Sequence, residues 1–191
     1  HRAIVNADAP ASERLLAAPA CPAPTFAIQH GADLRARDLA AGLRELRLTI
    51  ESPRGTFPVT LRLTGWYNAY NALAATGVGL ALGIDPPTIT RGLERISGIP
   101  GRFEVGETGQ PFLGVIDFAH TTAALEKLLR TTRNLISGRL LTVFGCPGDR
   151  DRTKRAAMGE VAARLSEYTV LTTDNPASED PADIARQIQE G

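Results

Sequence analysis

Residues 138–174 read GRLLTVFGCPGDRDRTKRAAMGEVAARLSEYTVLTTD and decide the fold of the second half of the chain. An apolar run at 140–144 leads into a turn with Gly145 and Gly148, and apolar residues then recur at helical spacing over 158–165. The pattern predicts a strand, a helix and a second, parallel strand, which together form one βαβ unit. At the two glycines the backbone must bend or approach a neighbour closely. The helix start faces this turn, where its free N–H groups can bind an anion.

The composition is that of an ordinary α/β protein without a strong charge. Of 191 residues 43% are hydrophobic, and 21 Lys and Arg residues balance 21 Asp and Glu residues, so no overall field attracts nucleic acid or an anionic membrane. Cys21 and Cys146 form no CxxC pair, which favours a reducing compartment without disulfides. We find no signal peptide, and the longest apolar run, 72–84, is too short to cross a bilayer. We therefore predict a cytoplasmic protein.

In the first third of the chain, the spacing of apolar residues changes from mixed patterns to a period of two residues. We expect strands at 3–6 and 25–29 and a helix at 12–17. Apolar and polar residues then alternate between residues 46 and 63, on both sides of an SPRG turn at 52–55. This alternation predicts an antiparallel hairpin inserted beside the first strands.

Two helices are expected after the hairpin. Residues 66–82 are apolar on most faces, as in a helix packed on several sides, and Gly83 ends this helix. Asp85 can cap the next helix, with Pro86 near its first position. The buried stripe of that second helix is predicted to be Ile89, Leu93 and Ile96.

The best candidate linker is SGIPGR at 97–102, because its glycines and prolines interrupt both the helical and the strand pattern of apolar residues. We place the domain boundary there, which gives domains at 1–99 and 100–191. Both ends of the chain are predicted to be cuts through folded protein.

Strands and helices alternate beyond this linker. We expect a strand at 112–119, a helix with Leu125 on its apolar face, the βαβ unit, and a last helix capped by Asp180 with Pro181 at its first position. Such alternation predicts a doubly wound parallel sheet, so the fold class is α/β.

Polar side chains follow three of the predicted strands. In an α/β sheet, ligands bind at the carboxyl ends of the strands, so these residues are expected to converge on one edge. Asp174 and Asn175 could equally cap the following helix. Asp117 is harder to explain in that way, because Thr121 or Thr122 can cap the helix that follows it. The candidates are Asp117, His120, Asp149, Arg150, Asp174 and Asn175.

Three other polar groups also have structural explanations. Asn68 and Asn71 lie at i, i+3 in an apolar helix, where neighbouring backbone could satisfy them or a ligand could contact them. The basic run at 150–155 contains an Asp and lacks interleaved aromatic residues, so we interpret it as a solvated or anion-facing helix start rather than a nucleic-acid site. His30 is interpreted as a surface residue.

Six motifs, in register over nearly the whole chain, resemble the Mur ligases, which are ATP-dependent enzymes of peptidoglycan precursor synthesis. The resemblance is closest to the type that adds the third amino acid to a UDP-N-acetylmuramoyl-dipeptide. The motifs are NADAP at 6–10, YNAYNALAA at 67–75, GIPGRFE at 98–104, DFAHT at 117–121, FGCPGDRDRTKR at 144–155 and TDNPASEDP at 173–181.

The resemblance implies two partial domains. Residues 1–99 would be the latter part of a P-loop-type central ATPase domain with the antiparallel hairpin, and 100–191 the first part of a Rossmann-like C-terminal domain with a parallel sheet. The family's GKT/S phosphate loop, upstream Mg²⁺ ligands and carbamylated lysine do not occur in this chain. The fragment alone is therefore not expected to catalyse the reaction, for which the parent enzyme would use ATP and Mg²⁺.

Site residues can be carried over by position from the motifs. In the family, the asparagines and the hinge arginine lie near the nucleotide, and the C-terminal strand ends receive the incoming amino acid, whose carboxylate a guanidinium can pair bidentately. The resemblance thus implies ATP binding by Asn68, Asn71, Arg102, Asp117 and His120, the last with a less certain role. It implies amino-acid binding by Arg150, Asp174, Asn175 and the neighbouring position of Ala177.

Two departures from the family pattern bear on specificity. Diaminopimelate-adding members usually read DNPR, with the arginine on the distal carboxylate, and here that position is Ala177. We therefore expect lysine or another amino acid as the substrate. Pro147 stands where the family has Gly and removes one N–H from the loop, which weakens any anion grip there.

The predicted parent is a ligase that transfers the γ-phosphoryl group of ATP to a carboxylate and lets an amino group attack the acyl phosphate. Cyanophycin synthetase and folylpolyglutamate synthase are related alternatives with other acceptors. A non-catalytic nucleotide-binding module is the alternative from another class. A Rossmann oxidoreductase fits less well, since no GxGxxG opens a helix.

Overall fold

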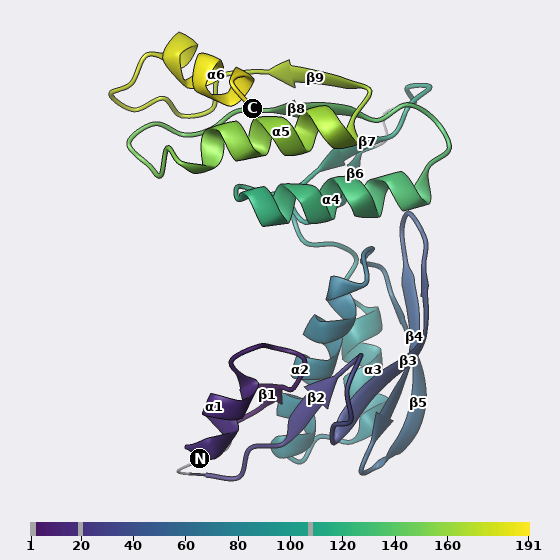
Figure 1. Cartoon of the computed structure of the whole chain (residues 1–191). Coiled ribbons are helices and arrows are strands. Elements are labelled where there is room, and N and C mark those ends of the chain that lie inside the picture. The colour runs from purple at the N-terminus through teal and green to yellow at the C-terminus, as the bar shows by residue number, and fades with distance from the viewer. Residues whose placement is uncertain (1–2, 19–20, 107–108) are drawn as a thin grey trace. The chain divides into compact units, whose positions relative to one another are not determined.

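The computed structural model describes residues 3–18, 21–106 and 109–191. The chain divides into two compact units, His1–Ile116 and Asp117–Gly191. Figure 1 labels the helices and strands of both units. In the described residues, no helix is both long and apolar enough to span a membrane.

A five-stranded mixed sheet forms the first unit. Its strands are β1 (Val5–Asn6), β2 (Thr25–Ala27), β3 (Leu34–Ala41), β4 (Leu46–Ser52) and β5 (Gly55–Leu61), and they lie side by side in chain order. β1, β2 and β3 are parallel, whereas β3, β4 and β5 are antiparallel. The predicted hairpin is confirmed, and so is the α/β class.

Helices α2 (Tyr67–Ala81) and α3 (Pro86–Glu94) pack against this sheet, while α1 (Ser12–Ala17) contacts β1. The Asp85 carboxylate caps α3 by accepting a hydrogen bond from the Thr88 N–H at 2.9 Å, as predicted. Ile89 and Leu93 are buried in the core. Ile96 is 40% exposed beyond the end of α3, so its predicted place in the buried stripe is wrong.

The second unit contains α4 (Thr122–Leu135), β8 (Leu141–Phe144), α5 (Lys154–Leu165), β9 (Tyr168–Leu171) and α6 (Pro181–Gln189). β8 and β9 are parallel, which confirms the predicted βαβ unit, and α5 contacts both α4 and α6. The Asp180 carboxylate caps α6, as predicted, by accepting from the Ala182 N–H. A second core lies between these elements, with Leu125, Met158, Val161, Ile184 and Ile188 among its members.

Three features of the sheets differ from the sequence-based expectation. β3 was not expected, because its alternation stops where a register shift follows Arg37. The strand expected at 112–119 is only β7 (Gly114–Ile116), which pairs antiparallel with β6 (Glu104–Gly106) and not with β8. A doubly wound sheet buries both faces, but one face of the β8–β9 pair is exposed in the described structure. This face consists of Leu141, Val143, Tyr168 and Val170.

Asp8, which follows β1, ties three segments of the first unit together. Its carboxylate is 4% exposed and accepts hydrogen bonds from the N–H groups of Ile28, Gln29 and His30 at 2.6 to 3.0 Å and from the Tyr70 hydroxyl at 2.8 Å. His30 Nδ1 lies 2.6 Å from Asp8 Oδ1, and its ring is exposed at the surface, as expected. Burial alone would raise the pKa of Asp8, but the hydrogen bonds outweigh burial and hold this pKa well below its usual range.

Replacing Asp8 by Asn should lower the free energy of unfolding by about 2 kcal/mol, because charge-assisted hydrogen bonds become neutral or are lost. Urea unfolding of the chain at pH 7 measures this loss. Since the folded pKa is depressed, the contribution is complete above the unfolded value of about 3.9 and disappears as the pH falls through the folded value.

The matched control is Asp38→Asn, at an exposed residue of β3 whose φ of 53° asparagine tolerates. We expect less than about 0.5 kcal/mol for this change. Equal effects of the two substitutions would contradict the structural role of Asp8.

Candidate functional site

The loops that follow β8 and β9 approach each other at backbone contact. The Gly148 N–H donates to the Asn175 carbonyl at 2.8 Å, and the Thr172 N–H donates to the Phe144 carbonyl at 3.0 Å. A Cβ on Gly148 would overlap the Pro176 carbonyl oxygen, and one on Gly145 would overlap that of Thr172. The close approach expected at both glycines is therefore confirmed.

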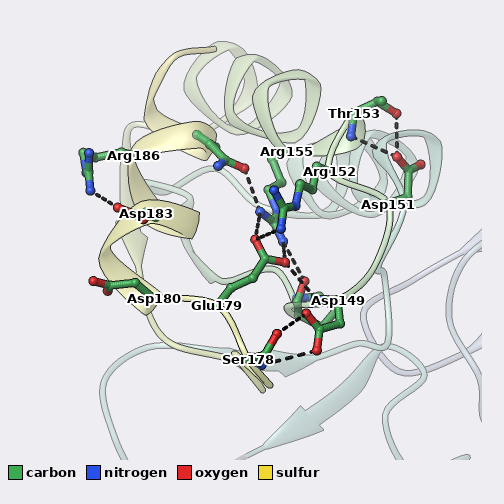
Figure 2. A network of polar contacts seen from close by, with 12 residues as sticks. Asp149, Asp151, Arg152, Thr153, Arg155, Ser178, Glu179, Asp180, Asp183 and Arg186 are labelled. Atoms are coloured by element: carbon green, nitrogen blue, oxygen red, sulfur yellow. Dashed lines mark hydrogen bonds and ion pairs between the residues drawn. The ribbon is translucent and has the colours of Figure 1, made fainter.

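A buried arginine, Arg155, forms hydrogen bonds to both of these loops (Figure 2). The Arg155 side chain is fully buried, and its Nη1 and Nη2 atoms donate to the Glu179 oxygens at 2.9 and 3.0 Å. Nη1 also donates to Gln187 Oε1 at 2.6 Å, and Nη2 to the Pro147 carbonyl at 3.1 Å. Arg155 in α5 thus contacts α6, the loop before it and the loop after β8.

Glu179 also accepts a hydrogen bond and an ion pair from the loop after β8. It accepts from the Asp149 N–H at 2.7 Å, and Arg152 Nη2 lies 3.1 Å from its carboxylate. The hydrogen bonds from Arg155 and then from the Asp149 backbone lower the pKa of Glu179 to about 2. Reciprocally, the Glu179 carboxylate raises the pKa of Arg155. The pair therefore stays ionised over the physiological pH range.

A second bridge joins the same two loops. Asp149 adopts a left-handed conformation, with φ of 54°, and its carboxylate accepts from the Ser178 hydroxyl at 2.7 Å and the Ser178 N–H at 3.3 Å. Asn and Asp are among the residues that tolerate this conformation. The loop after β8 is therefore held to the loop after β9 by side chains on both sides of Gly148.

The candidate amino-acid-binding residues lie on these two loops. Arg150 follows β8, whereas Asp174, Asn175 and Ala177 follow β9, and all four are exposed. Asn175 Oδ1 accepts from the Ala177 N–H at 3.3 Å and so shapes its own loop. Capping of α6 by Asp174 or Asn175, the other interpretation of these residues, does not occur, because Asp180 is the cap.

Asp117 and His120 lie in the segment that precedes α4 in the second unit. Asp117 is half-buried, and the exposed His120 has its Nδ1 3.0 Å from the Phe118 carbonyl. The His120 carbonyl accepts from Lys154 Nζ at 2.7 Å, which ties this segment to the first residue of α5. Within the second unit, Lys154 therefore connects the segment before α4 to the start of α5.

Asn68, Asn71 and Arg102 lie in the first unit. Asn68 is buried and donates to the Thr64 carbonyl at 2.6 Å, and Asn71 Nδ2 donates to Asn68 Oδ1 at 2.9 Å. This is the satisfied pair that the structural interpretation expected. Thr64 and Arg102 also line a cleft of about 680 Å³ beside the segment at 97–105. The other charged residues of its lining are Arg44, Glu45, Arg62 and Glu104.

The described part of the chain contains no group of three or more His, Cys, Asp or Glu side chains arranged to hold a metal ion. These residues therefore provide no site that would hold Mg²⁺ with protein side chains alone.

Sequence reasoning missed the two buried carboxylate centres. Arg155 belongs to the run interpreted as a solvated or anion-facing helix start. Solvation is wrong for Arg155, which is buried against the Glu179 carboxylate, whereas Arg150 and Arg152 are exposed. The only sequence signal for the pair was that Glu179 precedes the capping residue of a helix next to the βαβ unit. Nothing local marked Asp8 as a centre of hydrogen bonding.

Comparison with known proteins places both halves of the chain in one family. The profile described as "Mur ligase middle domain" matches residues 1–79, and that described as "Mur ligase, glutamate ligase domain" matches residues 101–191. The chain belongs to the Mur ligase family. Within this Mur ligase chain, the contact of the loops after β8 and β9 lies in the glutamate ligase domain.

Curated relatives of this Mur ligase chain are named UDP-N-acetylmuramoyl-L-alanyl-D-glutamate–2,6-diaminopimelate ligase. The Bacillus velezensis protein is 40% identical over 190 residues and the Gloeobacter violaceus protein 44% over 191. Each alignment covers the whole chain but only 39% of the relative, so the chain spans about two fifths of its relatives' length.

Solved structures of Mur ligases and of a folylpolyglutamate synthase are similar to this chain. A structure of a UDP-N-acetylmuramoyl-L-alanyl-D-glutamate–2,6-diaminopimelate ligase is 32% identical, with a TM-score of 0.65, over all of this chain and 40% of the other. Mycobacterium tuberculosis folylpolyglutamate synthase gives a TM-score of 0.80 at 21% identity over 99% of this chain and 43% of the other, which shows a shared fold.

Gly148→Ala should destabilise the second unit by about 2 kcal/mol or more, because the new Cβ would overlap the Pro176 carbonyl and force the two loops apart. Thermal unfolding of the chain, followed by circular dichroism, measures the change. The matched control is Gly138→Ala, where a Cβ meets open space. If the two variants melt at the same temperature as the unmodified chain, the backbone contact is not tight.

Proposed function

We propose that this chain is part of a longer ATP-dependent ligase, which joins an amino acid through an amide bond to the carboxyl group of a UDP-N-acetylmuramoyl-dipeptide. The observation that carries the proposal is 40 to 44% identity along the whole chain to ligases of that name, across two family domains in the order expected. The second unit supports it, because Arg150 and Asn175 are exposed on two loops whose backbones are hydrogen-bonded to each other.

Residues of the first unit support nucleotide binding in the cleft beside 97–105. Its lining carries three arginines against two glutamates, so the cleft keeps an excess of positive charge that suits an anionic phosphate chain. The arginines are Arg44, Arg62 and Arg102, and the glutamates are Glu45 and Glu104.

Near the start of α2, Asn71 is exposed and would face the purine edge, while the buried Asn68, bonded to the Thr64 carbonyl and to Asn71, would hold Asn71 in place. In the second unit, the DFAHT motif at 117–121 supports ATP binding by Asp117 and His120. ATP would supply the phosphoryl group that activates the acceptor carboxylate.

The incoming amino acid would bind at the loops after β8 and β9. Arg150 would pair with its α-carboxylate, and Asp174 and Asn175 would orient it. Ala177 has a φ of 49° and only a methyl side chain, so it offers no cation for a distal carboxylate. We therefore propose lysine or another amino acid without a second carboxylate, in contrast to the diaminopimelate in the names of the relatives.

Two other functions make different predictions. A non-catalytic nucleotide-binding module would bind ATP but release no phosphate on addition of an amino acid. A folylpolyglutamate-type ligase would use glutamate, but the supporting likeness at 21% identity extends to the fold alone.

The test is amino-acid-dependent phosphate release by the full-length protein that contains this chain, with the UDP-dipeptide and lysine, ornithine, diaminopimelate or glutamate. We expect kcat/KM for lysine or ornithine to exceed that for diaminopimelate by at least about tenfold. The reason is that the distal carboxylate of diaminopimelate would find no cationic partner at Ala177. Ala177→Arg should move the preference towards diaminopimelate.

The matched control is Ala163→Arg, which changes an exposed alanine of α5 away from these loops. It should leave the preference unchanged. Preference of the unmodified enzyme for diaminopimelate would overturn the assignment of Ala177, and absence of phosphate release with every amino acid would overturn the ligase itself.

A further inference from the structure

The pair Arg155 and Glu179, named here the buried clamp, has contacts that a purely stabilising ion pair would not need. Its polar atoms reach the main chain on both sides of Gly148, since Arg155 donates to the Pro147 carbonyl and Glu179 accepts from the Asp149 N–H. Arg150 is the next residue after Asp149. The clamp therefore fixes the backbone that carries Arg150.

The clamp acts on the opposite loop as well. Glu179 lies two residues beyond Ala177, and the Gly148 N–H that the clamp flanks is bonded to the Asn175 carbonyl. Asp149 adds a bridge to Ser178, so the contact is held from both loops. Movement of Glu179 would shift 175–177 relative to Arg150, although no atom of the clamp belongs to these exposed residues.

Stability alone gives a poor account of this arrangement. A buried ion pair often contributes little net stability, because desolvation of the two charges offsets their attraction. Arg155 Nε is buried and finds no hydrogen-bond partner among the described residues, so the arginine is not optimally satisfied. What the forked guanidinium does supply is geometry, since one planar group holds Glu179, Gln187 and the Pro147 carbonyl in fixed directions.

We propose that Arg155 and Glu179 are positioning residues, which set the distance between the Arg150 guanidinium and the loop at 174–177 and thereby the affinity for the incoming amino acid. This inference rests on the proposed function, because it assigns the clamp to the same binding edge. Displacing a substrate-holding group by about 1 Å can lower a rate by about a hundredfold, so a residue behind the loop can govern binding without touching the substrate.

The experiment compares Glu179→Gln and Arg155→Lys in the full-length enzyme. Glutamine keeps an acceptor but loses the charge, and lysine keeps the charge but loses the fork. We expect KM for the amino acid to rise at least about tenfold in Glu179→Gln and by less in Arg155→Lys. KM for ATP and for the UDP-dipeptide should stay within about twofold, because the hydrogen bonds of the clamp join α5 and α6 to the two loops proposed for the amino acid.

A matched ion pair at the other ends of the same strands provides the control. Arg133 donates to both Glu167 oxygens at 2.5 and 2.7 Å, and Glu167 accepts from the Leu140 N–H just before β8. Arg133→Gln removes an Arg–Glu pair from the same unit that is more exposed than the clamp and touches neither of the two loops. It should leave the amino-acid KM unchanged even if it lowers the melting temperature.

Ser178→Ala provides a second variant if the clamp variants fail to fold. It removes the hydroxyl of an exposed residue that bridges to Asp149 and should raise the amino-acid KM about threefold. The positioning role alone would be overturned if the amino-acid KM were unchanged in every variant that folds. It would also be overturned if KM for ATP rose equally, or if Arg133→Gln raised the amino-acid KM as much. No amino-acid-dependent turnover in the unmodified enzyme would overturn the proposed function and this inference together.

Discussion

The close backbone contact between the loops after β8 and β9 is the constraint on which the second unit depends. Two glycines permit it, because any side chain at Gly148 would overlap the Pro176 carbonyl. The Arg155–Glu179 pair then fixes its geometry from the buried side. As a result, the exposed residues on the two loops stand on a rigid base, which a binding edge requires.

The same physical device recurs in the first unit with different residues. Asp8 follows β1 as a nearly buried carboxylate and gathers N–H groups from the loop after β2, together with the Tyr70 hydroxyl of α2. Glu179 likewise gathers a backbone N–H and two arginines across the ends of β8 and β9. In each unit, one carboxylate with a lowered pKa holds loops at the carboxyl ends of parallel strands, which are the usual place for ligands in α/β folds. This is why a chain without net charge can still have strongly organised local electrostatics.

Local patterns predicted the helices of this protein well and the long-range contacts poorly. The helix expected at 12–17 is α1, and the caps Asp85 and Asp180 were identified because a cap needs only the next three residues. β3 escaped prediction because Asp38 has a φ of 53° and the register shift there interrupts the alternation. The burial of Arg155 could not be read from its basic neighbours, since its partner Glu179 lies 24 residues further along the chain. For the same reason Asp8, whose partners lie 20 to 62 residues away, gave no local signal.

Membership in the Mur ligase family gives these loops a chemical context, and the Arg155–Glu179 pair gives them their rigidity. The most direct test of this account is an NMR titration of the Glu179 carboxyl carbon in the folded chain. Because Arg155 and the Asp149 N–H stabilise the ionised form, we predict that Glu179 stays deprotonated until the pH falls to about 2. A titration midpoint near the ordinary value of 4.5 would mean that the pair does not hold the two loops together.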